Sequence, residues 1–347
     1  MADKMAMNGY RLAVVGATGA VGREVLRILE ERAFPVAELM LLASPRSAGR
    51  RIGAHTVQAI APERFDGLDL AIFDTPDPVA EEWVPVAAGR GLIAIDNSAA
   101  FRMAEGVPLV IPEVNADDLD HLPRRIVANP NCTCATIAVP LGALHRDAGL
   151  QKVIACSYQS VSGAGQGGVE QLWSELREAA ARGLPPDGPG GKAFPHPIAM
   201  NILPSIGRLH GAHTSEEVKV AAELRKLLHV PTLRVGMTCV RVPTLVGHGV
   251  AVHAEFRSPL DPDRARAILE RAPGVAVVDE PSSAAYPTAL LAAGRDPCYV
   301  GRIRTDEAGN LAFFAAADNL RKGAALNTVQ IAEHLVQRGL VRSSVRA

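Results

Sequence analysis

The sequence predicts an α/β protein of two domains, the first on a doubly wound parallel sheet and the second on a mixed α+β sheet. Before residue 131, short apolar runs that end in turn residues alternate with stretches of helical periodicity, as buried parallel strands joined by helices do. After residue 150 the strand candidates are longer and richer in β-branched residues. The chain has 347 residues, more than a single hydrophobic core usually supports, so two domains are expected.

The composition excludes several classes of protein. Lys and Arg number 36 against 37 Asp and Glu, so the chain has no global field for nucleic acid or for an anionic membrane. Its apolar runs are far shorter than a membrane span, and the first ten residues, MADKMAMNGY, lack the apolar region of a signal peptide. Five scattered cysteines do not form a disulfide framework. A soluble cytoplasmic protein with reduced thiols is expected.

The first domain is expected to span residues 1–131. Its strands are predicted at RLAVVG (11–16), AELMLLAS (37–44), LDLAIFD (68–74), LIAIDNS (92–98) and RIVANPN (125–131). A helix is predicted in ATGAVGREVLRILEER, directly after the first strand. A C-terminal helix over 322–347 is expected to pack back on this domain and complete it.

The second domain is expected to span residues 132–321. Two helices, near 165–182 and 215–229, lie among its strand candidates, and the Gly- and Pro-rich stretch 183–197 is predicted to be a loop that could carry an oligomer contact. The strands are predicted at KVIACSYQSV (152–161), TLRVGMTCVRVP (232–243), GVAVHAEF (249–256), CYVGRIRT (298–305) and NLAFFAAAD (310–318).

The glycines of VVGATGAVG predict a dinucleotide site between the first strand and its helix. Gly16 permits a tight turn, Gly19 lets backbone N–H groups approach a pyrophosphate, and Gly22 permits close packing of helix on strand. The spacing G-x-x-G-x-x-G departs from the usual dinucleotide fingerprint, and a bare tight turn is the alternative. The cofactor-binding residues expected in this loop are Gly16, Thr18, Gly19, Ala20 and Val21.

The end of the second strand favours NADP over NAD. Proteins that prefer NAD usually place Asp or Glu there for the ribose 2′-hydroxyl, whereas this chain has Ser44, Arg46 and Ser47. Arginine and hydroxyl groups suit a 2′-phosphate. A solvated basic loop is the alternative.

The stretch NPNCTC (129–134) raises the possible roles of Cys132 and Cys134. A zinc site would need a second pair of ligands at the right spacing, and a redox pair more usually has the spacing C-x-x-C. A buried structural role is the default for a free cysteine, and we expect it for Cys134, Cys156, Cys239 and Cys298.

Cys132 differs because a predicted helix begins beside it. The helix dipole and the free N–H groups at a helix N-terminus stabilise a thiolate, which suits a nucleophile. A nucleophile also needs a base. Among ten histidines, His248 is distinctive because glycines flank it between two apolar strands, but on local grounds it could be exposed as readily as catalytic.

Seven motifs, in order from about residue 10 to 338, resemble the aspartate-β-semialdehyde dehydrogenase family. They are GATGAVG, NSAAFRM, NPNCTC, SYQSVSGAG, SEEVKVAAELRKLL, CVRVPTLVGH and DNLRKGAALNTVQIAE. The resemblance implies a Rossmann-like NADP-binding domain and a catalytic and dimerisation domain of the glyceraldehyde-3-phosphate-dehydrogenase-like type. It also implies a homodimer or homotetramer that contacts its copies through the sheet of the second domain.

The resemblance further implies a role for individual residues. Cys132 would be the nucleophile, His248 the general acid/base, and Gln159 would orient the acyl intermediate. Arg241 would hold the substrate α-carboxylate, with Asn131 shaping the pocket and Arg102, Glu216 and Lys219 bordering the phosphate and substrate-amine region. Asn319 would contact the nicotinamide end, and Ser162 and Gly163 join it in the implied cofactor site.

Each role has a structural alternative. Arg102 could cap a loop, and Gln159 and Asn319 could be ordinary hydrogen-bonding residues at strand ends. Glu216 and Lys219 also fit a helix start, with Thr214 and Ser215 as cap candidates and an i,i+3 ion pair after them. Arg241 has the weakest alternative, because a buried guanidinium without an anion is costly.

One stretch departs from the family pattern. Where relatives have Ser-x-Gly-Gly after the third strand, this chain has DTPDP (74–78), and Thr75 is expected to replace part of the lost cofactor contact.

The implied activity is the NADP-dependent, reversible reductive dephosphorylation of L-4-aspartyl phosphate to L-aspartate-4-semialdehyde through a thioacyl enzyme. That reaction feeds lysine, methionine and threonine synthesis. The implied partners are the small substrate and inorganic phosphate, with neither metal nor nucleic acid. The alternatives are N-acetyl-glutamyl-phosphate reductase, glyceraldehyde-3-phosphate dehydrogenase and a catalytically silent paralogue.

Overall fold

The computed structural model describes residues 9–344, which form two compact units. One unit contains the chain up to Pro130 and the segment from Ala324, and the other contains Asn131–Gly323. The N-terminal residues 1–8, on which the signal-peptide expectation partly rests, and the last three residues of the helix expected over 322–347 lie outside the described part.

The first unit is a six-stranded parallel sheet in the order β5-β2-β1-β6-β7-β8. The five strands predicted from apolar runs are confirmed; the short β5 was not anticipated. The bounds are β1 (Tyr10–Val15), β2 (Val36–Ala43), β5 (Gln58–Ala59), β6 (Leu70–Phe73), β7 (Ile93–Asp96) and β8 (Ile126–Ala128). The order turns back between β1 and β6, and ligands of open α/β sheets bind at such a point, beyond the carboxyl ends of the strands.

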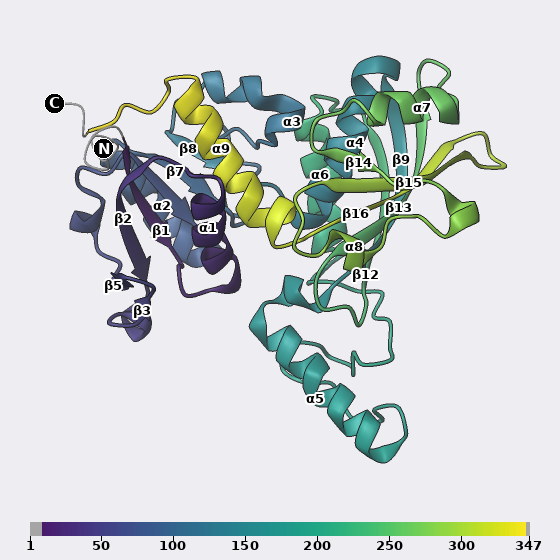
Figure 1. Ribbon diagram of the computed structural model, residues 1–347, viewed down its shortest axis with the longest axis horizontal. Coiled ribbons are helices and arrows are strands. Elements are labelled where there is room, and N and C mark those ends of the chain that lie inside the picture. Colours follow the sequence, from purple (N-terminus) through teal and green to yellow (C-terminus); the bar gives the residue numbers. More distant parts are fainter. Residues whose placement is uncertain (1–8, 345–347) are drawn as a thin grey trace. The chain divides into compact units, whose positions relative to one another are not determined.

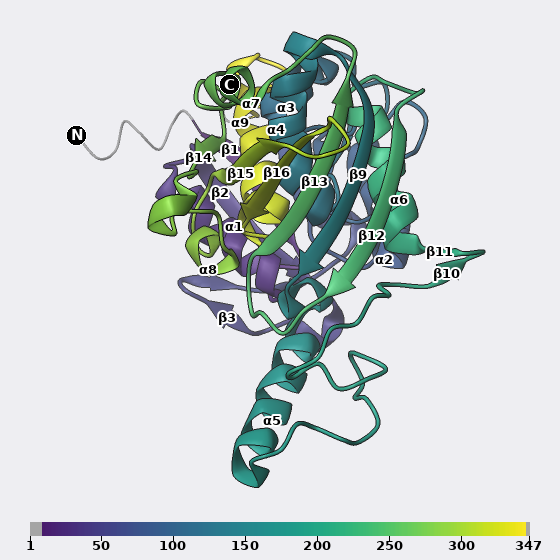
Figure 2. The same cartoon turned by 90° about the vertical axis from the view of Figure 1, so that its right-hand side faces the viewer.

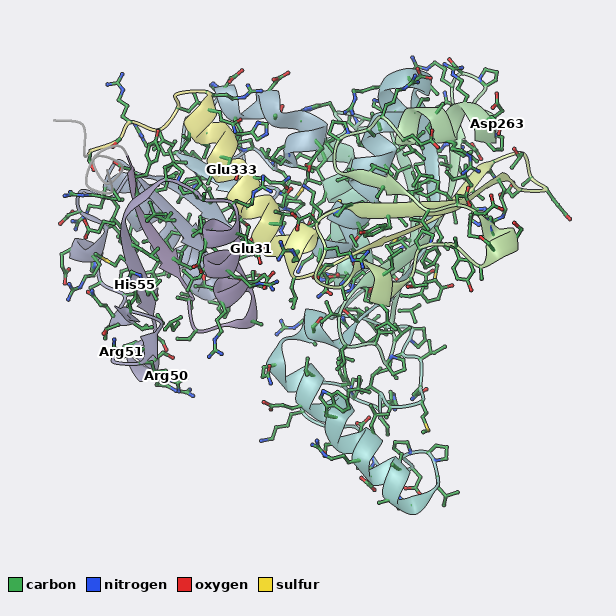
Figure 3. All side chains as sticks on the ribbon, viewed as in Figure 1. Glu31, Arg50, Arg51, His55, Asp263 and Glu333 are labelled. Atoms are coloured by element: carbon green, nitrogen blue, oxygen red, sulfur yellow. The ribbon has the colours of Figure 1, made fainter. Side chains whose placement is uncertain are left out.

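Helices flank this sheet. Figure 1 shows α1 (Ala20–Glu31) beside α9 (Leu326–Gln337). Arg32, directly after α1, forms an ion pair at 2.8 Å with Glu333 of α9, which is labelled in Figure 3. A small hairpin of β3 (Arg51–Ile52) and β4 (His55–Thr56) lies next to β2 and carries Arg50, Arg51 and His55 (Figure 3). The other helices of this unit are α2 (Asp77–Gly89) and α3 (Pro112–Asn115).

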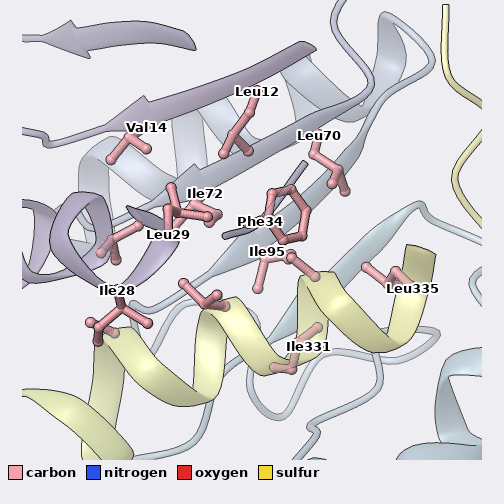
Figure 4. Packing of buried hydrophobic residues seen from close by; sticks show 14 of the residues in the cluster. Leu12, Val14, Ile28, Leu29, Phe34, Leu70, Ile72, Ile95, Ile331 and Leu335 are labelled. Carbon is pink, nitrogen blue, oxygen red and sulfur yellow. The ribbon is translucent and has the colours of Figure 1, made fainter. Parts of the chain in front are cut away.

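The core of the first unit joins the sheet to α1 and α9. Leu12, Val14 and Ile72 from the strands pack with Ile28 of α1 and Ile331 of α9, and all five side chains are fully buried (Figure 4). This burial explains why the C-terminal segment folds back onto the parallel sheet.

The C-terminal helix is shorter than the predicted span of 322–347. A π-helical turn, Arg321–Ala325, precedes α9, and α9 ends at Gln337, shortly before Gly339. Gly339 has a φ of +68°, which a helix cannot continue through, and its presence explains the early end.

The second unit is a six-stranded mixed sheet in the order β12-β9-β13-β16-β15-β14. The five predicted strands are confirmed, whereas the short strand Val275–Val277 and a separate two-stranded hairpin were not anticipated; Figure 2 shows the strands of the sheet side by side. Their bounds are β9 (Leu150–Gln159), β12 (Arg234–Arg241), β13 (His248–Phe256), β14 (Val275–Val277), β15 (Cys298–Thr305) and β16 (Leu311–Ala317), with β10 (Leu209–His210) and β11 (His213–Thr214) forming a separate hairpin.

One face of this sheet is covered by helices and the other is open. The central helix α4 (Cys132–Ala148) packs against β9, β13, β15 and β16, with α6 (Ser215–Leu227) beside β12 and α7 (Pro262–Leu269) beside β15. On the open face, Ile154 and Tyr158 of β9 are 49% and 39% exposed. The helix α5 (Gln166–Arg182) extends away from the sheet of its unit (Figures 1 and 2), and α8 (Ala289–Ala292) contacts β16.

Two further predictions for the second unit concern its loops and helices. The stretch 183–197 contains no helix or strand, as expected from its Gly and Pro content, and the helices predicted near 165–182 and 215–229 are α5 and α6.

Among the described residues, no helix is long and apolar enough to cross a membrane.

Candidate active site

Cys132 is the first residue of α4, as predicted. Asn131 caps the helix, and its side-chain oxygen accepts hydrogen bonds from the backbone N–H groups of Thr133 at 2.8 Å and Cys134 at 3.2 Å. The cap fixes the path of the chain at the point where the thiol leaves it. Asn131 was expected only to shape a pocket, and its capping role was not anticipated.

His248 lies next to the thiol of Cys132, although the two residues are 116 positions apart in the sequence. Its Nε2 lies 3.3 Å from the Sγ of Cys132, and its ring is fully buried at the first position of β13. Burial and the nearby Arg241 guanidinium lower the pKa of His248 to about 3, so the ring is neutral near pH 7. The sequence left open whether His248 is exposed or faces the interior, and the structure shows that it faces the interior.

Ser160 holds the far side of the His248 ring. Its backbone N–H donates to Nδ1 at 3.1 Å, and its hydroxyl lies 3.1 Å from the same nitrogen. The backbone N–H needs the lone pair of Nδ1 and so stabilises the tautomer that carries its proton on Nε2. In the other tautomer, Nδ1–H donates a hydrogen bond to the Ser160 hydroxyl in place of the backbone contact, and Nε2 is free as a base. Ser160 was missed in the sequence, although it directly follows the predicted Gln159.

Arg241 ends β12 opposite Gln159, in register on β9. Its guanidinium is buried, donates to the carbonyl oxygen of Ser160 at 2.7 Å and lies 5.8 Å from the Phe194 ring centre. Burial lowers the pKa of Arg241, and no carboxylate of the described chain forms an ion pair with it. A buried guanidinium in this state suits an anionic ligand.

Glu216 and Glu223 bind Asn131 from one side of α6. One carboxylate oxygen of Glu216 accepts from the Asn131 side-chain amide at 2.8 Å and from Gln159 at 3.0 Å. The carboxylate of Glu223, which is 1% exposed, accepts from the backbone N–H of Asn131 at 2.6 Å. Glu223 was not identified from the sequence, and its only signal there is a spacing of two helical turns from Glu216.

The structural alternative for this helix start is also partly correct. Thr214 is the N-cap of α6 and forms a capping box with Glu217. Glu216 and Lys219 do not form the expected i,i+3 ion pair among the described residues, because Glu216 is directed to Asn131 and Gln159. Lys219 lies one turn further along and is half-buried.

Asn319 supports the histidine side of the site. Its side-chain oxygen accepts from the Ser160 hydroxyl and from the Gly247 N–H, both at 2.9 Å, and its amide donates to the Ser162 hydroxyl at 2.9 Å. Gly163 lies close by, and a Cβ there would come within 2.9 Å of an Arg241 nitrogen. These contacts match the structural alternative for Asn319, and its cofactor contact stays a prediction.

The glycine loop of the first unit borders a cavity of about 490 Å³. Gly16 has a φ of +89°, and a Cβ there would lie 1.9 Å from the carbonyl oxygen of Asp74, so the turn requires glycine. Ala20 and Val21 open α1, and the first N–H groups of a helix have no acceptor inside it. The predicted cofactor residues that line the cavity are Gly16, Thr18, Gly19, Ser44 and Thr75.

These residues fit a dinucleotide. The Thr75 hydroxyl is buried and has no hydrogen-bond partner in the described chain, which is expected of a group that binds a ligand. Arg46 and Ser47 lie in a short 3₁₀ turn, Pro45–Ser47, directly after β2. The Arg46 guanidinium is exposed and pairs with no described carboxylate, so it is available to a phosphate.

Arg102 lies in the first unit, where its side chain connects the segments that follow β7 and β8. Its guanidinium donates to the carbonyl oxygens of Asn129 at 2.9 Å and Asn97 at 2.8 Å, and the residue is largely buried. These contacts match its structural alternative, and a role at the substrate phosphate stays a prediction.

The prediction that the four other cysteines are buried is confirmed for three of them and wrong for Cys156. Cys134, Cys239 and Cys298 are buried, but Cys156 is partly exposed. Strand β9 alternates, so that Val153, Ala155 and Ser157 face the helices while Cys156 points to the open face with Ile154. In the described part of the chain, no three His, Cys, Asp or Glu side chains gather as a metal site requires.

Comparisons with known families match both units. Residues 11–122 match the family model described as semialdehyde dehydrogenase, NAD binding domain, and residues 141–322 match the one described as semialdehyde dehydrogenase, dimerisation domain. The fold predicted from the sequence is thereby confirmed.

Individual relatives agree over the full length. The chain is 44% identical to an aspartate-semialdehyde dehydrogenase of Aquifex aeolicus, with 96% of this chain and 100% of that protein aligned. It is 41% identical to the Bacillus subtilis protein of the same name, over 96% and 99%. The crystal structure of aspartate semialdehyde dehydrogenase II from Vibrio cholerae superposes with a TM-score of 0.89 at 38% identity, covering 95% of this chain and 99% of that one. The chain therefore belongs to the aspartate-semialdehyde dehydrogenase family.

Proposed function

We propose that this protein is an NADP-dependent aspartate-semialdehyde dehydrogenase of the phosphorylating type, acting through a thioacyl intermediate on Cys132. The observation that carries this proposal is the thiol of Cys132 at the start of α4, 3.3 Å from the buried Nε2 of His248. A thiol, a base and an unpaired guanidinium side by side are what acyl transfer from an anionic substrate requires.

Cys132 forms and breaks the bond to the substrate. Its sulfur attacks the acyl carbon of L-4-aspartyl phosphate, phosphate leaves, and a thioester remains. A nicotinamide, when bound, would supply the hydride that reduces this thioester. Cys132 leaves as a thiolate when the resulting thiohemiacetal collapses to the semialdehyde, and it regains its proton from His248. In reverse, phosphate attacks the thioester and acyl phosphate forms.

His248 moves the proton that accompanies these steps. With Nε2 free, the ring takes the thiol proton; with Nε2 protonated, it donates a hydrogen bond to the sulfur or to the oxygen on the attached carbon. A neutral ring suits both uses, since an imidazolium held permanently at this position could not act as a base.

Arg241 and the Asn131–Glu216–Gln159 cluster position the substrate. Arg241 binds the α-carboxylate through its planar fork, and the carboxylate of Glu216 attracts the substrate ammonium group. Gln159, which donates to Glu216, orients the acyl group, while Lys219 and Arg102 serve the phosphate.

For the cofactor, NADP is proposed over NAD. The matched family model describes an NAD binding domain, and a protein of the same fold, the aspartate semialdehyde dehydrogenase from Candida albicans at 21% identity, has a crystal structure with NADP. In this chain, Ser44, Arg46 and Ser47 stand where an acidic residue would otherwise select the ribose hydroxyl.

The remaining proposals are a homodimer or homotetramer, contacted through the open face of the second sheet, and a cytoplasmic location. Support for the first comes from the matched dimerisation domain and from the exposed Ile154 and Tyr158. The second suits an enzyme whose nucleophile must stay reduced.

The test is NADPH formation from L-aspartate-4-semialdehyde and NADP, with and without inorganic phosphate. We expect turnover that depends on phosphate, is lost in Cys132→Ser by a factor of at least about 10³, and is nearly unchanged in Cys134→Ser. NADPH binding should survive in both variants. Equal losses in both would contradict the assigned nucleophile, and a rate independent of phosphate would contradict the phosphorylating reaction.

A further inference from the structure

A carboxyl group occupies the nucleotide cavity of the first unit. Asp74 directly follows β6, at the turn-back point of the sheet, and its backbone N–H donates to Val15 of β1 at 2.8 Å. Its side-chain oxygen accepts from the N–H of Gly22 at 3.1 Å and would lie 3.3 Å from a Cβ on Gly19. The acid therefore caps α1 from outside the helix.

This position is unusual because the helix N-terminus is also where a dinucleotide places its pyrophosphate. The Gly22 N–H is taken by Asp74, and the N–H groups of Ala20 and Val21 are left for the ligand. Two anions must then share one helix end. The other side chains that line the cavity are apolar or carry hydroxyl groups, so no cation there separates them.

We propose that Asp74 couples cofactor binding to a proton: the carboxyl caps α1 as a carboxylate in the free protein and becomes neutral when the pyrophosphate binds beside it. The proton comes from solvent. The neutral form removes one of two like charges, and its O–H becomes a donor to the phosphate while the other oxygen keeps the Gly22 N–H. This inference rests on the proposed dinucleotide cofactor.

The charges around Asp74 support an easily gained proton. Burial raises the pKa of Asp74 to about 6, the Gly22 N–H lowers it, and the charge of Asp96 on β7 raises it. Asp96 is itself bound by Ser98 and lies in the fields of Arg102 and of Asp77, which begins α2. Phosphate charge added at the helix end raises the pKa of Asp74 further.

The sign of the effect follows from these shifts. Cofactor affinity is highest below the pKa of about 6 of the free carboxyl, and it falls as pH rises until the carboxyl of the complex also ionises. In that window the dissociation constant rises by roughly tenfold per pH unit, because one proton is bound with each cofactor.

The experiment is isothermal titration of the full-length protein with NADH from pH 6 to 9, in buffers of different ionisation enthalpy that report proton uptake. NADH is the probe because it lacks the 2′-phosphate, whose own titration near pH 6 has the opposite effect. Quenching of Trp83, which lines the cavity, gives a second readout of binding. The wild-type protein should take up close to one proton per NADH near pH 7.5.

Three variants make the assignment specific. Asp74→Asn keeps an oxygen for the Gly22 N–H but cannot ionise, so it should bind NADH with no pH slope and about tenfold or more tightly than wild type at pH 8. Asp74→Ser should behave likewise. Asp77→Asn is the matched control, since it removes a carboxylate three residues away, and it should keep the wild-type slope.

An unchanged slope and proton uptake in Asp74→Asn would overturn the inference, as would pH-independent NADH binding by the wild-type protein, even if NADPH oxidation proceeds normally. Failure of the wild-type protein to bind either NADH or NADPH would overturn the proposed cofactor and the inference together. Thermal unfolding of each variant checks that the first unit is folded.

Discussion

Arg241 is the residue that we propose to bind the substrate α-carboxylate. Its guanidinium is buried, has a carbonyl oxygen and an aromatic ring as neighbours, and lies in the field that keeps His248 neutral. A carboxylate bound to the remaining N–H donors of Arg241 would neutralise the guanidinium charge. The lowering of the His248 pKa by that charge would then be smaller. If Arg241 binds the carboxylate as proposed, substrate binding and the basicity of His248 are linked through this residue.

Arg241→Lys should raise the KM for the semialdehyde by about 10- to 100-fold, because an ammonium group cannot form the bidentate fork and one charged hydrogen bond is lost. Binding of NADPH should be unchanged. Steady-state kinetics beside a fluorescence titration with NADPH measures both. An unchanged KM would remove Arg241 from the substrate site.

Helix α6 is connected to Cys132, the proposed nucleophile, through Asn131. Glu216 and Glu223, two turns apart on one face, hold the side chain and the backbone of Asn131, which in turn caps the helix that begins with Cys132. The direction of the thiol is thus set by the packing of two helices. A small shift of α6 is expected to misalign the sulfur with its base.

Glu223→Ala should lower kcat by about 10- to 100-fold and slow alkylation of Cys132 by iodoacetamide, since it leaves the Asn131 N–H without its carboxylate acceptor. Glu223→Gln, which keeps an acceptor oxygen, should recover much of the loss. The comparison variant is Glu217→Ala, which removes the Glu217 half of the capping box and should cost about 0.5–2 kcal/mol of stability while leaving alkylation unchanged. Equal alkylation rates in Glu223→Ala and wild type would show that Glu223 does not position the thiol.

At the scale of the whole molecule, we propose that copies of the chain assemble through the open face of the second sheet. Ile154 and Tyr158 project from it, and Tyr158 lies against Phe314 with ring centres 6.2 Å apart. An apolar sheet face of this kind is characteristic of a surface that a second copy covers.

Ile154→Asp should convert the oligomer to smaller species, because a buried unpaired carboxylate at a subunit contact is strongly unfavourable. Light scattering after size-exclusion chromatography measures the mass. Leu290→Asp, which changes a side chain that is 89% exposed on α8, serves as the control and should keep the wild-type mass. A wild-type mass for Ile154→Asp would place the contact elsewhere.

Local patterns were sufficient to predict most elements and part of the site. The apolar runs 11–16, 37–44, 68–74 and 92–98 predicted parallel strands because both faces of such strands are buried. The glycine loop predicted its turn because only glycine permits the backbone at Gly16. Cys132 was predicted at a helix start because a stretch with helical character follows it directly. The resemblance to a known family then supplied the roles of Gln159, His248 and Arg241, which no local pattern carries.

The remaining features depend on contacts between segments far apart in the chain. The pairing of β12 and β13 with β9 brings Arg241 and His248 to Ser160, and the packing of α6 brings Glu223 to Asn131. Sheet register also turned Cys156 outward, and the closure of β6 on β1 put the Asp74 carboxyl against the glycine loop. A sequence determines local backbone preference and periodicity directly, whereas burial, charge state and the partner of each polar group are set by neighbours that only the folded chain assembles.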